Sequence, residues 1–109
     1  SARIMYEQNN INEAYKYFDH IIKNSKDIDV KNIAIYRKSK ILIEQKKFSE
    51  AHSLLGNKLK NYQHIELKGD LYLLQKDYDN AIINYKDVLT YALTPNERKN
   101  ILSKINLIK

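Results

Sequence analysis

The chain has no cysteine and no tryptophan, and only two glycines and one proline among its 109 residues. Without cysteine, a disulfide, a thiolate nucleophile and a thiolate metal site are all excluded, although either redox compartment remains open. Two glycines argue against β-hairpins and cannot build a glycine-rich phosphate loop. Apolar runs are short, as at Leu71-Tyr72-Leu73-Leu74, so neither a membrane span nor a signal peptide is predicted.

The beginning of the chain and its charge suggest its origin. It begins Ser1-Ala2 without an initiator methionine, which is typical of a cut fragment or a tag remnant. An upstream membrane anchor could have been removed in that way. The formal net charge is +6, but 16 of the 19 basic residues are lysine, and Lys, Asn, Ile and Tyr together supply 52 residues. A low-GC genome explains this bias, so nucleic-acid binding, which would favour clustered arginine, is disfavoured.

The chain contains three similar copies of a seven-residue motif, here called a phrase, which begins with glutamine and ends with alanine. The three alanines that end these phrases lie 37 and 30 residues apart. A period near 34 is typical of stacked helical hairpins. The copies are Gln8-Asn9-Asn10-Ile11-Asn12-Glu13-Ala14, Gln45-Lys46-Lys47-Phe48-Ser49-Glu50-Ala51 and Gln75-Lys76-Asp77-Tyr78-Asp79-Asn80-Ala81.

Each copy is expected to join two helices. The glutamine ends the first helix, and Asn10 or Asp77 is a suitable N-cap for the second. The alanine on the second helix and Ser39 or Gly69 on the first are small side chains, so the two helix backbones can approach closely where they cross. Gly56 is expected to end the second helix of the middle repeat early or to bend it. Helices are predicted at 11–24, 28–45, 48–59, 62–75 and 78–92, with only the last turns of a first helix before Gln8.

A further helix is predicted after Leu93. Thr94-Pro95-Asn96-Glu97 combines an N-cap, a proline at the first position and a glutamate three residues after the cap. The following apolar face would cover the exposed end of the last repeat, which includes Tyr85 and Leu89. That face consists of Ile101, Ile105 and Ile108.

These residues resemble the tetratricopeptide repeat consensus. The third repeat matches it through Gly69, Tyr72, Tyr78, Ala81 and Tyr85. The second matches through Ser39, Leu42, Phe48, Ala51 and Leu55, and the first through Ile11, Ala14 and Phe18. The departures are Lys38 and Lys68, which stand where leucine is preferred, and Lys58, which replaces a small residue.

The resemblance implies an all-α fold. Antiparallel helical hairpins would stack into a right-handed superhelix with a C-terminal capping helix. The implied organisation is one domain over 1–109, with a partial repeat at about 1–26, repeats at about 28–60 and 62–92, and the cap at about 95–108.

A narrower resemblance is to YfgM-type proteins. It is carried by the segment from Glu66-Leu67-Lys68-Gly69-Asp70 to Ala81, by Gln45-Lys46-Lys47, and by the helix from Thr94-Pro95 to Lys104-Ile105-Asn106-Leu107. Those bacterial proteins have one N-terminal membrane helix and a periplasmic domain, and they are ancillary to the SecYEG translocon. The resemblance implies the periplasmic face of the inner membrane if an anchor exists, and the cytoplasm otherwise.

No catalytic constellation emerges from the residues. His20, His52 and His64 form no metal-ligand motif, and the paired acids Asp27/Asp29 and Asp77/Asp79 stand at helix starts, where capping explains them. We therefore expect a protein that is not an enzyme and needs no cofactor, metal or small-molecule substrate.

The remaining functional surface is the concave groove, which the first helix of each hairpin lines in this fold. A protein or peptide segment would bind there. The clamp that some tetratricopeptide proteins use for chaperone C-termini is rejected, because Gln63 and Leu67 stand where basic residues are needed. The candidate partner-binding residues are Arg3, Tyr6, Glu7, Tyr36, Arg37, Lys40, Glu44, Gln63, Glu66 and Asp70.

Two other hypotheses stay open. The chain could be a structural module that self-associates, with its incomplete first hairpin pairing with another copy as a homo-oligomer. A helical repeat that binds nucleic acid is the less favoured alternative. Membrane contact is expected only through an anchor outside these residues.

Overall fold

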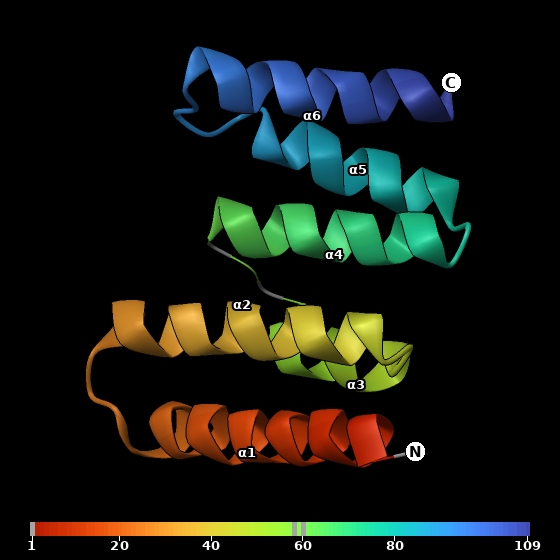
Figure 1. The fold of residues 1–109 in the computed structure, drawn as a ribbon. Helices are drawn as coiled ribbons and strands as arrows, with labels where there is room; N and C mark the ends of the chain where they lie inside the picture. Colours follow the sequence, from red (N-terminus) through yellow and green to blue (C-terminus); the bar gives the residue numbers. More distant parts are fainter. Residues whose placement is uncertain (1, 58, 60) are drawn as a thin grey trace. The chain divides into compact units, whose positions relative to one another are not determined.

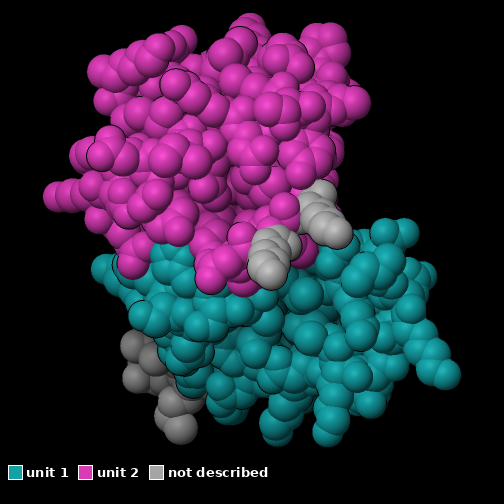
Figure 2. All heavy atoms as spheres, turned by 180° about the vertical axis from the view of Figure 1, so that it is seen from behind, with its two compact units in different colours: residues 1–54 teal, residues 55–109 magenta. Residues whose placement is uncertain are grey.

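The computed structural model describes residues 2–57, 59 and 61–109, with side chains from residue 7 onward. Over this part of the chain it is helical with no strand, which confirms the all-α prediction (Figure 1). The helices are α1 (Ala2–Asn24), α2 (Ile28–Glu44), α3 (Phe48–Leu55), α4 (Tyr62–Leu74), α5 (Tyr78–Val88) and α6 (Pro95–Ile108). The chain forms two compact units, Ser1–Leu54 and Leu55–Lys109, coloured separately in Figure 2. The single-domain organisation stays a prediction.

The first repeat differs from its prediction. α1 is one uninterrupted helix from Ala2 to Asn24, so the expected helix end at Gln8 and the N-cap at Asn10 are wrong. Extending an existing helix adds one hydrogen bond per residue, so continuation of α1 through Asn9 and Asn10 keeps helical bonds that a chain reversal would break.

The other two turns form as expected, through a residue that the sequence did not mark. Lys46 and Lys76 occupy the same place in their phrases and have φ angles of 60° and 62°. This left-handed conformation is uncommon outside glycine, and here it reverses the chain between α2 and α3 and between α4 and α5. The reversal is held by amide bonds from Lys47 to the Leu42 carbonyl and from Asp77 to the Tyr72 carbonyl, at 2.8 and 2.9 Å.

In the unit of residues 1–54, α1 packs against α2, and the small residues of the repeats are buried. Ala51 has no exposed surface, and Ser39 is equally buried on α2. Asp27 caps α2 by accepting bonds from the amides of Asp29 and Val30. α3 ends at Leu55, four residues before the end at 59 in the predicted range, and Gly56 follows with a φ angle of +79°, which agrees with the expected early end at this glycine.

In the unit of residues 55–109, α4 and α5 form the main hairpin and α6 packs on α5. Asp77 caps α5 as predicted, and α5 ends at Val88, four residues before its predicted end at 92. Thr94 and Glu97 form the complete capping box that the sequence indicated for α6. The core of this unit consists of Ile65, Ala81, Tyr85, Val88, Ile101 and Ile105.

α6 covers the end of this hairpin as predicted. Ile101 is 1% exposed and Ile105 is 5% exposed, and both contact the cluster that contains Tyr85. Ile108 and Leu89 are partly buried against the same cluster. The apolar stripe of α6 is therefore a core element of its unit.

Candidate interaction surfaces

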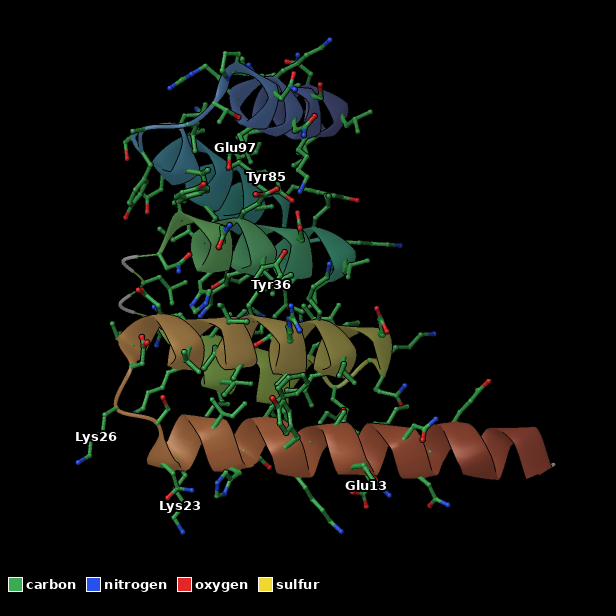
Figure 3. The ribbon with its side chains drawn as sticks, turned by 60° about the vertical axis from the view of Figure 1, so that its left-hand side comes forward. Glu13, Lys23, Lys26, Tyr36, Tyr85 and Glu97 are labelled. Carbon is green, nitrogen blue, oxygen red and sulfur yellow. The ribbon has the colours of Figure 1, made fainter. Side chains whose placement is uncertain are left out.

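Three residues of the candidate groove form a stripe along α2. Tyr36, Lys40 and Glu44 are spaced four residues apart, so they share one side of the helix. The Lys40 ammonium lies 5.6 Å from the centre of the Tyr36 ring, within the range of a cation–π contact. Figure 3 shows Tyr36 on the side of α2 opposite α1. We call these three residues the α2 stripe.

Arg37 lies apart from this stripe, in a groove between α1 and α2. The groove has a volume of about 140 Å³ and is predominantly apolar. Its lining residues are Tyr17, Phe18, Ile21, Val30, Ile33, Ala34 and Arg37. Several of them remain open to solvent, with Tyr17 at 64%, Ile33 at 54% and Val30 at 40% exposure. The structure thus places Arg37 beside apolar side chains and separates it from Tyr36.

Glu66 and Asp70 are already engaged within their own unit. The Lys104 ammonium of α6 donates to Glu66 Oε2 at 2.6 Å and to Asp70 Oδ1 at 2.9 Å. The Tyr85 hydroxyl also donates to Asp70 Oδ1, at 2.6 Å. Figure 3 shows Tyr85 projecting from α5 into this region between α4 and α6. Both predicted groove acids therefore hold the hairpin to the capping helix.

The charges in this cluster shift the titration of its members. Burial opposes the charged form of Lys104, but the bonds to Glu66 and Asp70 outweigh it and raise the pKa of the ammonium. Burial and the bond to Asp70 raise the pKa of the Tyr85 hydroxyl. Lys104 therefore stays charged and Tyr85 stays neutral at physiological pH, which keeps all three bonds to the carboxylates.

A second polar contact fixes the start of α6. The Tyr62 hydroxyl on α4 donates to Glu97 Oε2 at 2.6 Å, while Glu97 Oε1 accepts from the Thr94 amide at 2.9 Å. These bonds, with the Tyr62 bond contributing most, lower the pKa of the Glu97 carboxyl. Glu97, labelled in Figure 3, thus joins the capping box to α4.

The remaining candidate residues are more scattered. Gln63 is exposed on the first turn of α4. Glu7 is exposed on α1, which is continuous, so it does not lie on a separate first helix as predicted. Arg3 and Tyr6 belong to the same continuous helix, and their side chains lie outside the described part of the structure. The separate first helix that was to carry Arg3, Tyr6 and Glu7 does not form, and their role in partner binding stays a prediction.

Lys68 shows how the chain accommodates a departure from the consensus. Its side chain is buried with 4% exposure, and its ammonium donates to the Gly56 carbonyl and, at 3.0 Å, to Asn57 Oδ1. Burial lowers the pKa of this ammonium. Carbonyl oxygens at a helix C-terminus attract a cation, so Lys68 anchors the segment after α3 to α4. Lys38, the other departure, is paired with Asp19 at 2.5 Å.

Sequence reasoning missed two features of these surfaces. Lys104 received no role, although its place between Ile101 and Ile105 puts it at the edge of the α6 apolar face. The exposed apolar residues Tyr17 and Val30 were not singled out either, because periodicity does not show which apolar residues stay uncovered. Within the described residues, no group of histidines and acids could hold a metal ion. No described helix has the length and apolar content to span a bilayer.

Comparison with known proteins is consistent with this architecture. A family model described as a tetratricopeptide repeat-like domain matches residues 1–109. Searches among curated proteins and among solved structures gave no significant match. Domains of the matching family are generally non-enzymatic and mediate protein–protein interactions. With the family model covering the whole sequence, the chain belongs to the tetratricopeptide repeat-like domain family.

Proposed function

We propose that this domain is a non-enzymatic scaffold that binds a segment of a partner protein through the first helices of its hairpins. The observation that carries the proposal is the α2 stripe. Lys40 and Glu44 are exposed, and the Tyr36 ring beside Lys40 supplies a rigid apolar surface. Tyrosine is a typical anchor of protein interfaces, and exposed charges beside such an anchor favour a partner of complementary charge. Glu66 and Asp70 contribute indirectly, because Lys104 already holds them.

The specific version of this proposal places the domain beside the bacterial translocon or with periplasmic chaperones. Its support is the resemblance of the second repeat, the third repeat and the Thr94 helix to YfgM-type proteins. The proposal does not depend on that location. Any partner that presents a peptide or helix to the first helices would meet the same mixed-charge stripe.

The experiment compares two charge reversals that keep the net charge constant. The test variant is Lys40→Glu with Glu44→Lys in the α2 stripe. The control is Glu13→Lys with Lys16→Glu, an exposed pair on α1 whose charged atoms lie 3.9 Å apart. Figure 3 shows Glu13 projecting from α1 on the side away from α2. Binding of each variant to purified SecYEG in lipid nanodiscs, and to purified periplasmic chaperones, is measured by biolayer interferometry.

The test variant should bind about tenfold more weakly, because its reversed charges would repel the charges of a partner surface that complements Lys40 and Glu44. The control should bind like the unmodified domain. Equal affinities of both variants would rule out the α2 stripe as the binding surface. An absence of binding to every one of these partners would remove the translocon version of the proposal.

A further inference from the structure

Two helix pairs of this chain correspond residue by residue. The C-terminal part of α1, from Ile11 to Asn24, and α2 match α5 and α6 with a constant offset of 67 residues. The offset holds on both helices and at the cap between them, where Asp27 of α2 corresponds to Thr94 of α6. The matching pairs are Ala14 and Ala81, Tyr17 and Asn84, Phe18 and Tyr85, Ala34 and Ile101, and Arg37 and Lys104.

In the second of these pairs, α4 covers the groove between α5 and α6. The Asn84 amide nitrogen of α5 donates to the Ile65 carbonyl of α4 at 3.2 Å. Gly69 of α4 approaches Tyr85 so closely that a Cβ would lie 2.8 Å from its ring. At the edge of the groove, two carboxylates of α4, four residues apart in sequence, bind the cation of α6.

In the first pair the corresponding groove is open. Tyr17, the counterpart of Asn84, is 64% exposed, whereas the Asn84 side chain is partly buried. Arg37, the counterpart of Lys104, lines the open groove and is exposed. Among the described side chains, no carboxylate lies within ion-pair distance of Arg37. The α1–α2 groove therefore has an apolar floor and a cation at its edge, like the α5–α6 groove. It lacks the acidic helix that α4 provides there.

The residues before Gln8 do not suit the role of an acidic helix that covers the α1–α2 groove. By the same offset, Arg3 corresponds to Asp70. A chain reversal at Gln8 would therefore bring a second guanidinium to the place where the other pair has an acid. Like charges at short distance repel, which agrees with the straight course of α1. A second copy of this segment in the groove would meet Arg37 with the same unfavourable charge.

We propose that the α1–α2 groove binds an amphipathic helix of a partner protein. The helix lies antiparallel to α1, as α4 lies against α5, and presents two carboxylates four residues apart to Arg37. Its small residues approach Tyr17 and Phe18, and its apolar residues cover Ile33. The charge-assisted pair with Arg37 fixes its register. This inference rests on the proposed scaffold function but concerns a different surface from the α2 stripe.

The probe is a synthetic peptide with the sequence of residues 61–75, because this segment contains the helix that covers the corresponding groove. It is titrated into the full 109-residue chain and followed by amide chemical shifts. Shifts should appear at Tyr17, Ile21, Ile33 and Ala34. Arg37→Glu should weaken binding by about tenfold or more. A peptide that carries Glu66→Lys and Asp70→Lys should recover binding to Arg37→Glu.

The matched control is Lys23→Glu, which makes the same charge change on α1. Figure 3 shows Lys23 projecting on the side away from α2. Equal effects of Arg37→Glu and Lys23→Glu would overturn the proposal, and so would shifts confined to residues 55–109. Two further measurements test the other occupants. Peptide-free dimerisation that protects Tyr17 would assign the groove to a second copy, and peptide binding lost in a longer natural form would assign it to the protein's own upstream residues.

This experiment separates the two proposals. Loss of partner binding in the α2 stripe variant, together with no peptide binding, would leave the scaffold function standing and remove the groove. Peptide binding that depends on Arg37, without any effect of the α2 stripe variant, would leave the groove standing and remove the α2 stripe as the binding surface of the scaffold.

Discussion

The ring of Tyr85 lies so close to the backbone of Gly69 that a Cβ there would stand 2.8 Å from Tyr85 Cε1. Alanine normally favours a helix over glycine by about 1 kcal/mol. Here the crowding should outweigh that gain, and Gly69→Ala should destabilise the domain by about 1–3 kcal/mol. Denaturant unfolding followed by circular dichroism measures the change.

The control for this prediction removes the ring. In a Tyr85→Leu background the close contact is relieved, so Gly69→Ala should become neutral or stabilising. A double-mutant cycle gives the coupling between the two residues. A stabilising Gly69→Ala in the unmodified domain would show that α4 and α5 can move apart without cost.

Two adjacent residues of α6 should respond very differently to truncation. Ile101 is 1% exposed and belongs to the core cluster, whereas Leu102 is 45% exposed. Ile101→Ala should cost about 2–5 kcal/mol, because it leaves a cavity beside Tyr85. Leu102→Ala should change the stability by less than about 0.5 kcal/mol. Similar losses for both variants, measured by thermal unfolding, would mean that α6 packs through a different face.

The Glu97 carboxyl should make the stability depend on acid pH. Its pKa in the folded protein is lowered below the ordinary value of 4.5. Its contribution is therefore fully present above 4.5 and is lost as the pH falls through the lower folded value. The melting temperatures of the unmodified domain and Glu97→Gln should differ at neutral pH and converge in acid. Glu13→Gln, on an exposed part of α1, is the control, and a constant difference for Glu97→Gln would refute the assignment.

The Lys104 ammonium should make the stability of the domain depend on pH in alkaline solution. Its pKa is raised above the ordinary value of 10.5, so its stabilising contribution is present below 10.5 and is lost as the pH rises through the higher folded value. Lys104→Met should therefore lower the stability at neutral pH, and the difference should decrease only in strongly alkaline solution. Lys99→Met, at an exposed position of the same helix, is the control. A Lys104→Met variant as stable as the control would show that the two ion pairs contribute nothing.

Much of the helical architecture follows from local sequence signals. The Thr94 capping box and the buried Ala81 were predicted because a cap and a helix crossing depend on residues close in sequence. The α1 prediction failed although Gln8-Asn9-Asn10 carries the same signal as the other phrases. Whether the chain reverses also depends on the tertiary packing of the segment before the turn, and the local pattern does not supply that information.

The candidate site was less accessible to sequence reasoning. The acids Glu66 and Asp70 were correctly placed on a first helix, but their bonds to Lys104 join residues 38 and 34 positions apart. Such a contact depends on how α6 is rotated against α4, and helical periodicity does not determine that angle. The left-handed Lys46 and Lys76 were also missed, because lysine has no intrinsic preference for that conformation.

The contact between Tyr85 and the capping helix also has a consequence during synthesis on the ribosome. Lys104 is made 19 residues after Tyr85, a delay of about 1–4 s at the usual rates of translation. All of α4 and α5 lies within about the last 45 residues made by then, so this hairpin leaves the ribosome together with α6 or shortly before it. Any species in which α6 is detached leaves Asp70 without its cation and uncovers the surface that receives Ile101. Detachment of this one helix is therefore the opening that would expose the unit to association.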